Sequence, residues 1–496
     1  MNNCLSVPIR TKIKLLATNT TIYGFGNILS KLSAVLLIPI YTRYLSMAEV
    51  GIIALLEMAE LFIVTIVPLG LVNAIWRYFP ESTKKEKLKI LSSAFWGING
   101  IGIIVFLVLV FFREQIAFHL QLGVDGTKFL LILLCNSFLF VGGQFILWML
   151  QYEQKPIKYL ALSLFQFLGV LILNIIFIVF LDKGIVGVLY SKFIIFFILY
   201  LISGSFILWR AAVLPSITLL KKLMKYSLPL VIASFVTPIL TLSDRYFLNL
   251  FVSLEELGVY SIAYKFGMLI NMLLVVPLQR TLIPMIYQSG FDEDTGKIYK
   301  DAMFYYALIG CFFLIVMDVL ASSFLQFFAT KDYLSGAEII PWITFAYFVN
   351  GFRLFFRSSI VLKDKTSILG WIGTVAIILN LGLNYLLIRE LGVTGAVIAT
   401  VISYLFVVSC IYINAQRIMK IDWKWVRLIK LATITFVTIF SYNGLLRLGI
   451  QSNFLTVLLL LVFFVVSLLI TKTIGWREIS GIKIIVDKIS KALKKK

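Results

Sequence analysis

The sequence predicts an all-α polytopic membrane protein with about 14 transmembrane helices. Hydrophobic residues make up 60% of the 496 residues and charged residues only 14%, and the mean hydropathy is +0.99. Apolar windows long enough to cross a bilayer core, which needs about 20 residues per helix, follow one another along the chain. This composition excludes a soluble enzyme.

The expected spans are residues 19–43, 50–76, 90–112, 129–152, 157–181, 185–209, 227–251, 256–288, 302–328, 336–361, 367–388, 394–416, 427–446 and 453–472. Before the first of them, Arg10, Lys12 and Lys14 occur without a separate apolar core and cleavage site. We therefore expect the first helix to serve as an uncleaved start signal.

Lys and Arg residues indicate the orientation, because they accumulate in cytoplasmic connections. With both termini in the cytoplasm, seven of them lie outside, five lie within helices, and the remaining 33 of the 45 lie inside. This asymmetry accounts for the formal net charge of +21 without a nucleic-acid partner. Anionic membrane lipids are the expected partners of the basic turns.

Several catalytic chemistries lack the residues they need. The four Cys are scattered and His119 is the only His, which excludes a disulfide framework, a CxxC metal site and His-based activation of a nucleophile. The sequence contains no G-x-x-x-x-G-K-[ST] phosphate loop, and its connections are too short for a catalytic domain. We therefore expect neither an enzyme nor a bound cofactor.

The chain contains an internal repeat. The segment YLSMAEVGII, which includes Gly51, resembles FVSLEELGVYS, which includes Gly258, at an offset of 207 residues. The segment DKGIVGVLYS, which includes Gly184, resembles RELGVTGAVIAT, which includes Gly392, at an offset of 208. Nearly the same offset relates both pairs of segments, although the two pairs are far apart in the chain. We therefore expect the chain to consist of two homologous halves.

Six helices in each half give both repeats the same orientation, so that a pseudo-twofold axis along the membrane normal relates them. Two six-helix lobes then face each other across a central cleft. We predict an N-terminal lobe at 1–210, a basic cytoplasmic linker at 211–226, a C-terminal lobe at 227–418, two extra helices at 419–474, and a basic cytoplasmic tail at 475–496. The tail is interpreted as amphipathic on the membrane surface, with a solvated tail as the alternative.

Charged residues occur inside several expected spans, where each must face a wet cavity or a partner. They are Lys31, Lys192, Arg245, Lys265, Arg353, Glu57, Glu60, Asp244 and Asp318. Helix rise places Lys31 and Glu60 at similar depth, and Asp244 is positioned to neutralise Arg245 or Lys265. Structural ion pairs are one interpretation of these charges, and a binding site is the other.

The repeat favours a binding site, because the turn glycines are kept in both halves and the charges are not. At the offset of 207, Met58 matches Lys265, and Leu37 and Ile38 match Asp244 and Arg245. A basic cleft suits an anionic substrate such as a diphosphate, to which Arg donates forked hydrogen bonds and Lys presents a point charge. The candidate substrate-binding residues are Lys31, Arg245, Lys265 and Arg353, with Glu57, Glu60 and Asp244 as charge partners.

Oxygen-bearing side chains form a second candidate site. Asn380 and Asn384 are four residues apart and share a helix face, and Thr400 follows on the next span. Together with Asp244 they are candidate ligands of a coupling Na⁺, while hydrogen bonds between helices are the alternative. The sequence leaves Na⁺, protons and the membrane potential open as energy sources.

The segments LIPIYTRYLSMAEVG, VPLGLVNAIWRYF, SDRYFL and GVYSIAYK resemble the polysaccharide transporter family, the O-antigen flippases of the multidrug/oligosaccharidyl-lipid/polysaccharide exporter superfamily. The likeness covers most of the chain, including the two extra C-terminal helices. It implies that an undecaprenyl-diphosphate-linked oligosaccharide moves from the inner to the outer leaflet of a bacterial plasma membrane by alternating access. Of the family's basic cavity residues, it carries over chiefly Arg245 and Lys265. The expected partners are this lipid-linked substrate, membrane lipids and the polysaccharide polymerase machinery, and the expected state is a monomer.

Three other functions remain open. A cation-coupled exporter of small cationic molecules, from the same superfamily, should have an acidic cleft. A membrane-embedded polysaccharide ligase or polymerase needs catalytic groups on a substantial outer loop, whereas the outer loops here are short. A twelve-helix sugar facilitator is disfavoured by the extra helix pair and by RYFPESTKKEK, which lacks a G-x-x-x-D-R-x-G pattern.

Overall fold

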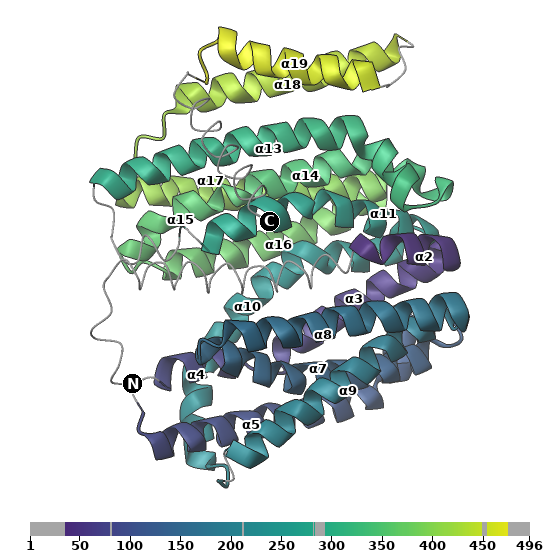
Figure 1. The fold of residues 1–496 in the computed structure, drawn as a ribbon, viewed down its shortest axis with the longest axis vertical. Coiled ribbons are helices and arrows are strands. Elements are labelled where there is room, and N and C mark those ends of the chain that lie inside the picture. Colours follow the sequence, from purple (N-terminus) through teal and green to yellow (C-terminus); the bar gives the residue numbers. More distant parts are fainter. Residues whose placement is uncertain are drawn as a thin grey trace, which may run out of the picture.

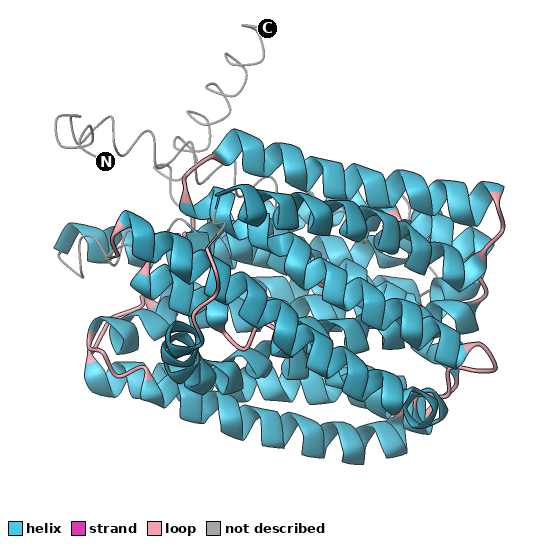
Figure 2. Ribbon diagram, turned by 90° about the horizontal axis from the view of Figure 1, so that it is seen from below, coloured by secondary structure: helices cyan, strands magenta, loops and turns pink. Residues whose placement is uncertain are grey.

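Helices form the regular structure of the computed structural model, which describes residues 35–79, 82–210, 213–280, 282, 293–448 and 454–474. The helices lie side by side, as expected of a membrane-spanning bundle (Figure 1, Figure 2). Among the described residues, 11 helices are long and apolar enough to cross a membrane, or up to 12 if one bent pair is a single span. The all-helical polytopic class is confirmed. The total of 14 remains a prediction, because most of the expected span 19–43 lies outside the described residues.

A first bundle of helices occupies the lower half of Figure 1. It consists of α2 (Ile38–Tyr44), α3 (Met47–Ile66), α4 (Leu71–Tyr78), α5 (Lys84–Phe111), α6 (Arg113–His119), α7 (Gly126–Tyr152), α8 (Pro156–Asn174), the π-helical turn η1 (Ile175–Phe180) and α9 (Gly184–Arg210).

A second bundle lies above it, and α18 and α19 lie at the upper edge (Figure 1). The second bundle consists of α11 (Leu254–Gly267), the π-helical turn η2 (Asn271–Val275), α13 (Glu293–Phe328), the 3-10 helix η3 (Lys331–Glu338), α14 (Ile339–Gly351), α15 (Arg353–Leu362), α16 (Ser367–Leu391) and α17 (Val393–Ile418). The remaining helices are α10 (Ile217–Phe251), α18 (Trp425–Arg447) and α19 (Phe454–Ile470).

Helix α10 connects the two bundles. It begins at Ile217, ten residues before the expected start at 227, and it bends by 44° at the break between Val231 and Ser234. Pro238 accounts for a bend at this place, because a proline removes the hydrogen bond to the carbonyl four residues earlier and its ring clashes there. Because of this bend, the first half of α10 packs against the first bundle and the second half packs against the second bundle.

The contacts of α10 follow this division. Directly before its first residue, the backbone N–H of Ser216 donates to Oγ of Ser93 on α5 over 2.8 Å, and in its first half Leu223 is buried in the apolar core of the first bundle. In its second half, the hydroxyl of Ser243 donates to Oδ1 of Asn380 on α16 over 3.0 Å. The Asp244 and Arg245 pair therefore lies on the half that packs against the second bundle.

Positions that the repeat pairs have the same local conformation. Ser46 caps α3 and Ser253 caps α11, each by accepting a hydrogen bond from the backbone N–H three residues later. Gly184 and Gly392 stand at the starts of α9 and α17 with φ of +52° and +57°, a left-handed conformation that glycine adopts readily. The offset found in the sequence thus corresponds to equivalent turns in the structure.

The paired glycines Gly51 and Gly258 lie where α3 and α11 cross. A Cβ on Gly51 would lie 2.1 Å from the carbonyl oxygen of Leu254, and one on Gly258 would lie 2.2 Å from that of Met47. Both distances are far shorter than any van der Waals contact, so the crossing depends on residues without side chains. The two bundles consequently touch backbone to backbone at the end that the basic residues predict to face outside.

Helix α18 packs against α13, where the hydroxyl of Tyr442 donates to the carbonyl of Val319 over 3.2 Å. The intramembrane Asp318 accepts a hydrogen bond of 3.4 Å from the amide of Asn443 on the same helix. Asp318 therefore faces the appended helices and not the other intramembrane charges. The tail predicted at 475–496 lies outside the described residues.

Candidate functional site

Two ion pairs join the charged residues of α3 to other helices. Nζ of Lys265 on α11 lies 3.0 Å from Oε1 of Glu57, and Nζ of Lys192 on α9 lies 2.6 Å from Oε2 of Glu60. The first pair crosses between the bundles, whereas the second stays within the first bundle. Glu57 and Glu60 are three residues apart, so one face of α3 presents both carboxylates.

The Lys265 and Glu57 pair is partly shielded. The Lys265 side chain is 10% exposed and that of Glu57 is 34% exposed. The ammonium also lies 5.9 Å from the ring centroid of Tyr41, within the range of a cation–π contact. Lys265 is therefore held by one carboxylate and one aromatic ring, both from the first bundle.

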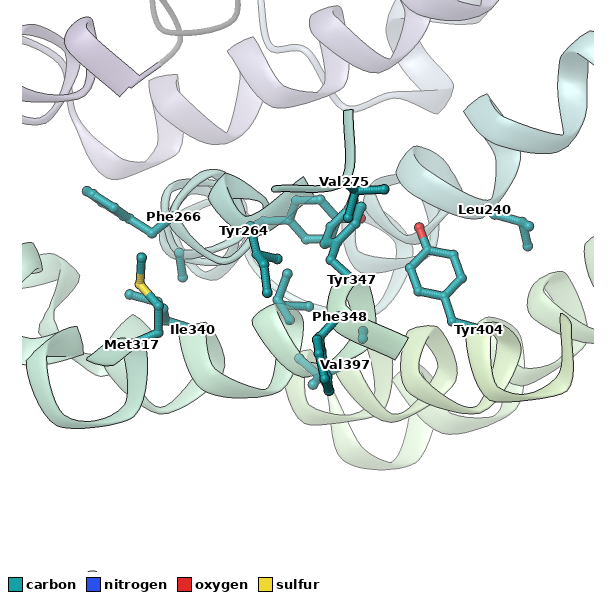
Figure 3. Close-up of a cluster of buried hydrophobic side chains, with 14 of the residues drawn as sticks. Leu240, Tyr264, Phe266, Val275, Met317, Ile340, Tyr347, Phe348, Val397 and Tyr404 are labelled. Carbon is teal, nitrogen blue, oxygen red and sulfur yellow. The ribbon is translucent and has the colours of Figure 1, made fainter. Parts of the chain in front are cut away.

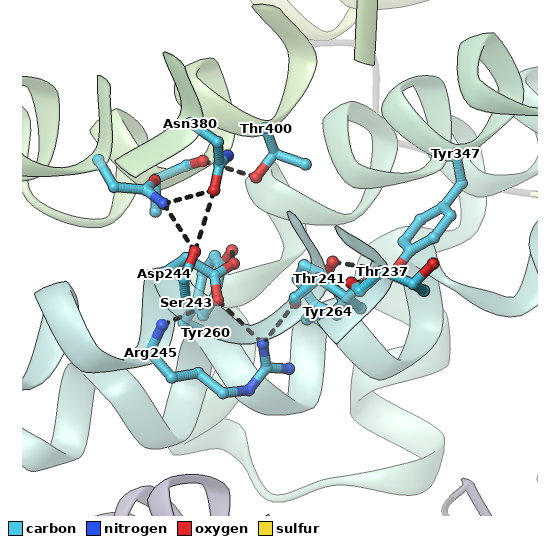
Figure 4. Close-up of polar contacts among 12 residues, drawn as sticks. Thr237, Thr241, Ser243, Asp244, Arg245, Tyr260, Tyr264, Tyr347, Asn380 and Thr400 are labelled. Carbon is cyan, nitrogen blue, oxygen red and sulfur yellow. Dashed lines mark hydrogen bonds and ion pairs between the residues drawn. The ribbon is translucent and has the colours of Figure 1, made fainter. Parts of the chain in front are cut away.

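Arg245 has its charge neutralised within the second half of α10 (Figure 4). Its guanidinium lies 3.0 Å from Oδ1 of Asp244, donates to the carbonyl of Thr241 over 3.1 Å, and sits 4.6 Å above the ring of Tyr264. The other carboxylate oxygen of Asp244 accepts a hydrogen bond from Tyr260. Of the two basic partners that the sequence left open for Asp244, the structure pairs it with Arg245.

One donor of Arg245 is unused. Its Nε is buried and has no hydrogen-bond partner among the described residues. A buried, unsatisfied donor on a charged group costs free energy. The guanidinium thus has capacity for one more acceptor.

Beside Arg245, the second bundle contributes three tyrosines, Tyr264, Tyr347 and Tyr404, which Figure 3 labels. The hydroxyls of Tyr264 and Tyr347 lie 2.9 Å apart, and the rings of Tyr347 and Tyr404 have centroids 5.7 Å apart. Arg353 lies at the start of α15 and forms no ion pair with another of the described residues. Sequence reasoning missed these tyrosines, although the four-residue spacing of Tyr260 and Tyr264 was a signal that both share a face with polar partners.

A cluster of amides and hydroxyls lies beside Asp244 (Figure 4). Nδ2 of Asn384 donates to Oγ of Ser243 over 3.3 Å and to Oδ1 of Asn380 over 3.2 Å. Nδ2 of Asn380 donates to Oγ of Ser403 over 3.1 Å. Sequence reasoning predicted the two amides and missed both serines, of which Ser243 directly precedes Asp244.

Two amides in this region have unused oxygens. Oδ1 of Asn384 is buried without a partner among the described residues, and so is Oδ1 of Asn249, five residues after Asp244 on α10. Thr400 donates its hydroxyl to the carbonyl of Ala396 over 2.9 Å, which leaves its oxygen lone pairs available. Such oxygens are the ligands that hard cations prefer.

One prediction cannot be compared with the structure. Lys31 lies outside the described residues, so its expected proximity to Glu60 stays a prediction, and the partner that Glu60 has in the structure is Lys192.

Among the described residues, no group of three or more His, Cys, Asp or Glu residues is arranged to hold a metal ion.

The intramembrane charges between the helices are nearly balanced. Among the described residues, Glu57, Glu60 and Asp244 are each paired with a basic residue, and Arg353 and Asp318 add one charge of each sign. Two helical bundles that face each other and are joined by an ion pair, here Lys265 with Glu57, are typical of membrane transporters, the class of protein that this fold and site define. A family model for polysaccharide biosynthesis proteins matches residues 16–289, more than half of the chain, and the protein belongs to that family.

Solved structures share this fold. The lipid II flippase MurJ in an inward closed conformation matches with a TM-score of 0.74 and 16% identity, over 92% of this chain and 99% of that chain. An inward-facing multidrug resistance MATE family transporter of the MOP superfamily matches with a TM-score of 0.62 and 15% identity, over 83% and 95% of the two chains. A Vibrio cholerae MATE transporter matches with a TM-score of 0.59 and 16% identity, over 82% and 97%. No curated protein matches the sequence. At these identities the likeness concerns the fold.

Proposed function

We propose that the protein is a flippase for an undecaprenyl-diphosphate-linked oligosaccharide, the repeat unit of an O-antigen, capsule or exopolysaccharide. It would move this substrate from the cytoplasmic to the outer leaflet of the bacterial plasma membrane, with both termini in the cytoplasm. Membership of the polysaccharide biosynthesis family supports this substrate class. The fold shared with a lipid II flippase supports the type of transport.

The observation that carries the proposal is the ion pair between Lys265 and Glu57, which joins the bundles at 3.0 Å. A diphosphate presents several anionic oxygens, which bind an ammonium in place of one carboxylate. Substrate binding at Lys265 would therefore release Glu57 and loosen the contact between the two six-helix lobes. Alternating access by the two lobes then follows from the exchange of one ion pair for another.

Arg245 would bind the substrate later in the cycle. Its charge is neutralised by Asp244. Its Nε–H, which has no partner among the described residues, would donate a hydrogen bond to a phosphate oxygen. Lys31 and Arg353 would contribute further positive charge to the cavity. Partners beyond the substrate and membrane lipids would be the polysaccharide polymerase machinery, and the transporter would act as a monomer.

The fold shared with MATE transporters supports one alternative, a cation-coupled exporter of small molecules. A site for a cationic drug needs unpaired carboxylates, whereas Glu57, Glu60 and Asp244 each have a basic partner. The flippase is therefore the better-supported function.

The function can be tested in vesicles that contain the purified protein and a fluorescent undecaprenyl-diphosphate-linked oligosaccharide in the inner leaflet. We expect an impermeant quencher added outside to reach the label only when the transporter is present. A strain that lacks the gene should accumulate the lipid-linked repeat unit and lose surface polysaccharide. Unchanged surface polysaccharide together with increased sensitivity to cationic drugs would instead support the exporter.

We also propose that the cluster around Asp244 binds the coupling Na⁺. Asp244, Asn380, Asn384 and Thr400 would ligate the ion, with the unpartnered oxygen of Asn384 as the first acceptor. These residues come from three helices, α10, α16 and α17. Binding of the ion would therefore depend on how these helices pack against one another.

Replacing Asn384 by Ala should weaken Na⁺ binding about 10- to 150-fold, the range expected when a charged ligand loses one polar partner. The measurement is initial transport rate against Na⁺ concentration, with choline as the replacing cation. Asn73→Ala, which removes an exposed amide on α4, is the matched control. Equal Na⁺ dependence in both variants, or transport that proceeds fully in choline, would contradict this site.

A further inference from the structure

The basic end of the first bundle contains a groove that none of the ion pairs above uses. The groove lies between α7, α8 and α9 and has a volume of about 870 Å³, which is within the size range of small-molecule sites in proteins. Its apolar lining includes Ile146, Leu150, Leu162, Ile202, Phe206 and Trp209. A second hollow of 500 Å³ continues along α9 and shares Ile202, Phe206 and Trp209 with it. The groove therefore offers an extended apolar surface to a chain-like ligand.

Basic side chains surround the end of this groove. Lys155, Lys158 and Arg210 line it together with a single carboxylate, Glu153. Oε2 of Glu153 lies 2.6 Å from Nζ of Lys155, and its other oxygen contacts Arg210. Lys158 is exposed and forms no ion pair with another of the described residues. Three positive charges and one negative charge leave the rim with an excess of two positive charges.

Aromatic side chains place the rim at the membrane surface. Trp209 is 86% exposed near the end of α9, and tryptophans are enriched at the headgroup level of a bilayer. The neighbouring Arg210 lies 5.3 Å from the ring centroid of Phe206. Charge at the headgroup level and an apolar floor below it match the two parts of a phospholipid.

The second half of the chain does not repeat this pattern. At the offset of 208, Phe206, Trp209 and Arg210 correspond to Asn414, Arg417 and Ile418, and Lys158 corresponds to Thr366. Only Lys155 has a basic counterpart, Lys363. Because the turns are kept and most of the groove residues are not, the fold by itself does not require Phe206, Trp209, Arg210 or Lys158.

We propose that this groove binds an anionic phospholipid of the surrounding leaflet. The phosphate would contact Lys158 and Arg210, and an acyl chain would lie along Ile202 and Phe206. Basic pockets between membrane helices at the cytoplasmic side bind anionic headgroups through such charges. The site lies outside the charged residues that join the bundles, so its occupant is a membrane lipid and not the transported substrate.

The test is native mass spectrometry of the full chain in a non-ionic detergent, titrated with phosphatidylglycerol or with phosphatidylcholine of the same acyl chains. We expect phosphatidylglycerol to bind more tightly, and Lys158→Gln to weaken it about fivefold, the factor for one basic residue at a membrane surface. The Lys155→Gln, Lys158→Gln, Arg210→Gln triple variant should lose the preference for phosphatidylglycerol.

The matched control is Lys363→Gln with Lys365→Gln, which removes exposed charges from the equivalent connection of the second half. It should leave phosphatidylglycerol binding unchanged. If the triple variant fails to fold, the single variant Lys158→Gln still tests the proposal. It should fold normally, because Lys158 is exposed. Equal binding of both lipids by the native chain, or equal losses in Lys158→Gln and in the control, would overturn the proposal.

Discussion

Replacing Lys265 by Met should abolish transport and destabilise the protein. The double variant Glu57→Gln, Lys265→Met should regain the stability of the native protein but not its transport. Removing Lys265 leaves Glu57 without its partner at membrane depth, at a cost of about 1–3 kcal/mol. Removing both charges eliminates that cost, because neither is left unpaired. If Lys265 binds the diphosphate, the double variant remains inactive despite being folded.

The measurements are thermal unfolding of the purified variants and uptake of the lipid-linked oligosaccharide in vesicles. The Glu60→Gln, Lys192→Met double variant is the matched control, because that pair has the same chemistry and stays within the first bundle. It should fold and transport. Native transport rates in the Glu57→Gln, Lys265→Met variant would show that the interbundle pair is structural and would remove Lys265 from the substrate site.

Replacing Gly51 or Gly258 by Ala should drive the two bundles apart at their crossing. The added Cβ would lie 2.1 Å or 2.2 Å from a backbone carbonyl oxygen, which no side-chain rotation relieves. Overpacking of this kind costs about 1–3 kcal/mol, which would shift the equilibrium away from the closed crossing by about 5- to 150-fold. We expect the transport rate to fall, because the two bundles then close too rarely at the end that is predicted to face outside.

A cysteine in place of the buried Ala54 on α3, in a chain whose four native cysteines are replaced by Ser, reports on this opening. An impermeant maleimide should label it faster in the Gly51→Ala and Gly258→Ala variants. Gly100→Ala and Gly382→Ala are matched controls, because a Cβ at either helical glycine meets no atom within 4 Å. Labelling rates that equal those of the controls would argue against a tight crossing in the membrane.

Of the spans that the sequence predicted, the described residues contain 11, or up to 12 if one bent pair is a single span, because bilayer thickness fixes how many apolar residues a span needs. It did not predict that the span expected at 50–76 is divided, with Leu69 and Gly70 in left-handed conformations between α3 and α4. It also placed the start of α10 too late, because Lys221, Lys222 and Lys225 were assigned to a linker. Lysines in an interfacial helical turn keep their ammonium groups in water, so charge alone does not end a helix.

The sequence by itself determined the membrane class and revealed the internal repeat, and it predicted which charged residues lie within the spans, since each depends on composition or on spacing along the chain. Only the tertiary structure decided the partners: Glu57 with Lys265 across the bundles, Glu60 with Lys192 within one, and Ser243 between two amides. Helix rise gives the depth of a side chain but not the direction in which its helix faces. That direction is fixed by packing between helices far apart in sequence, as where Gly51 meets α11.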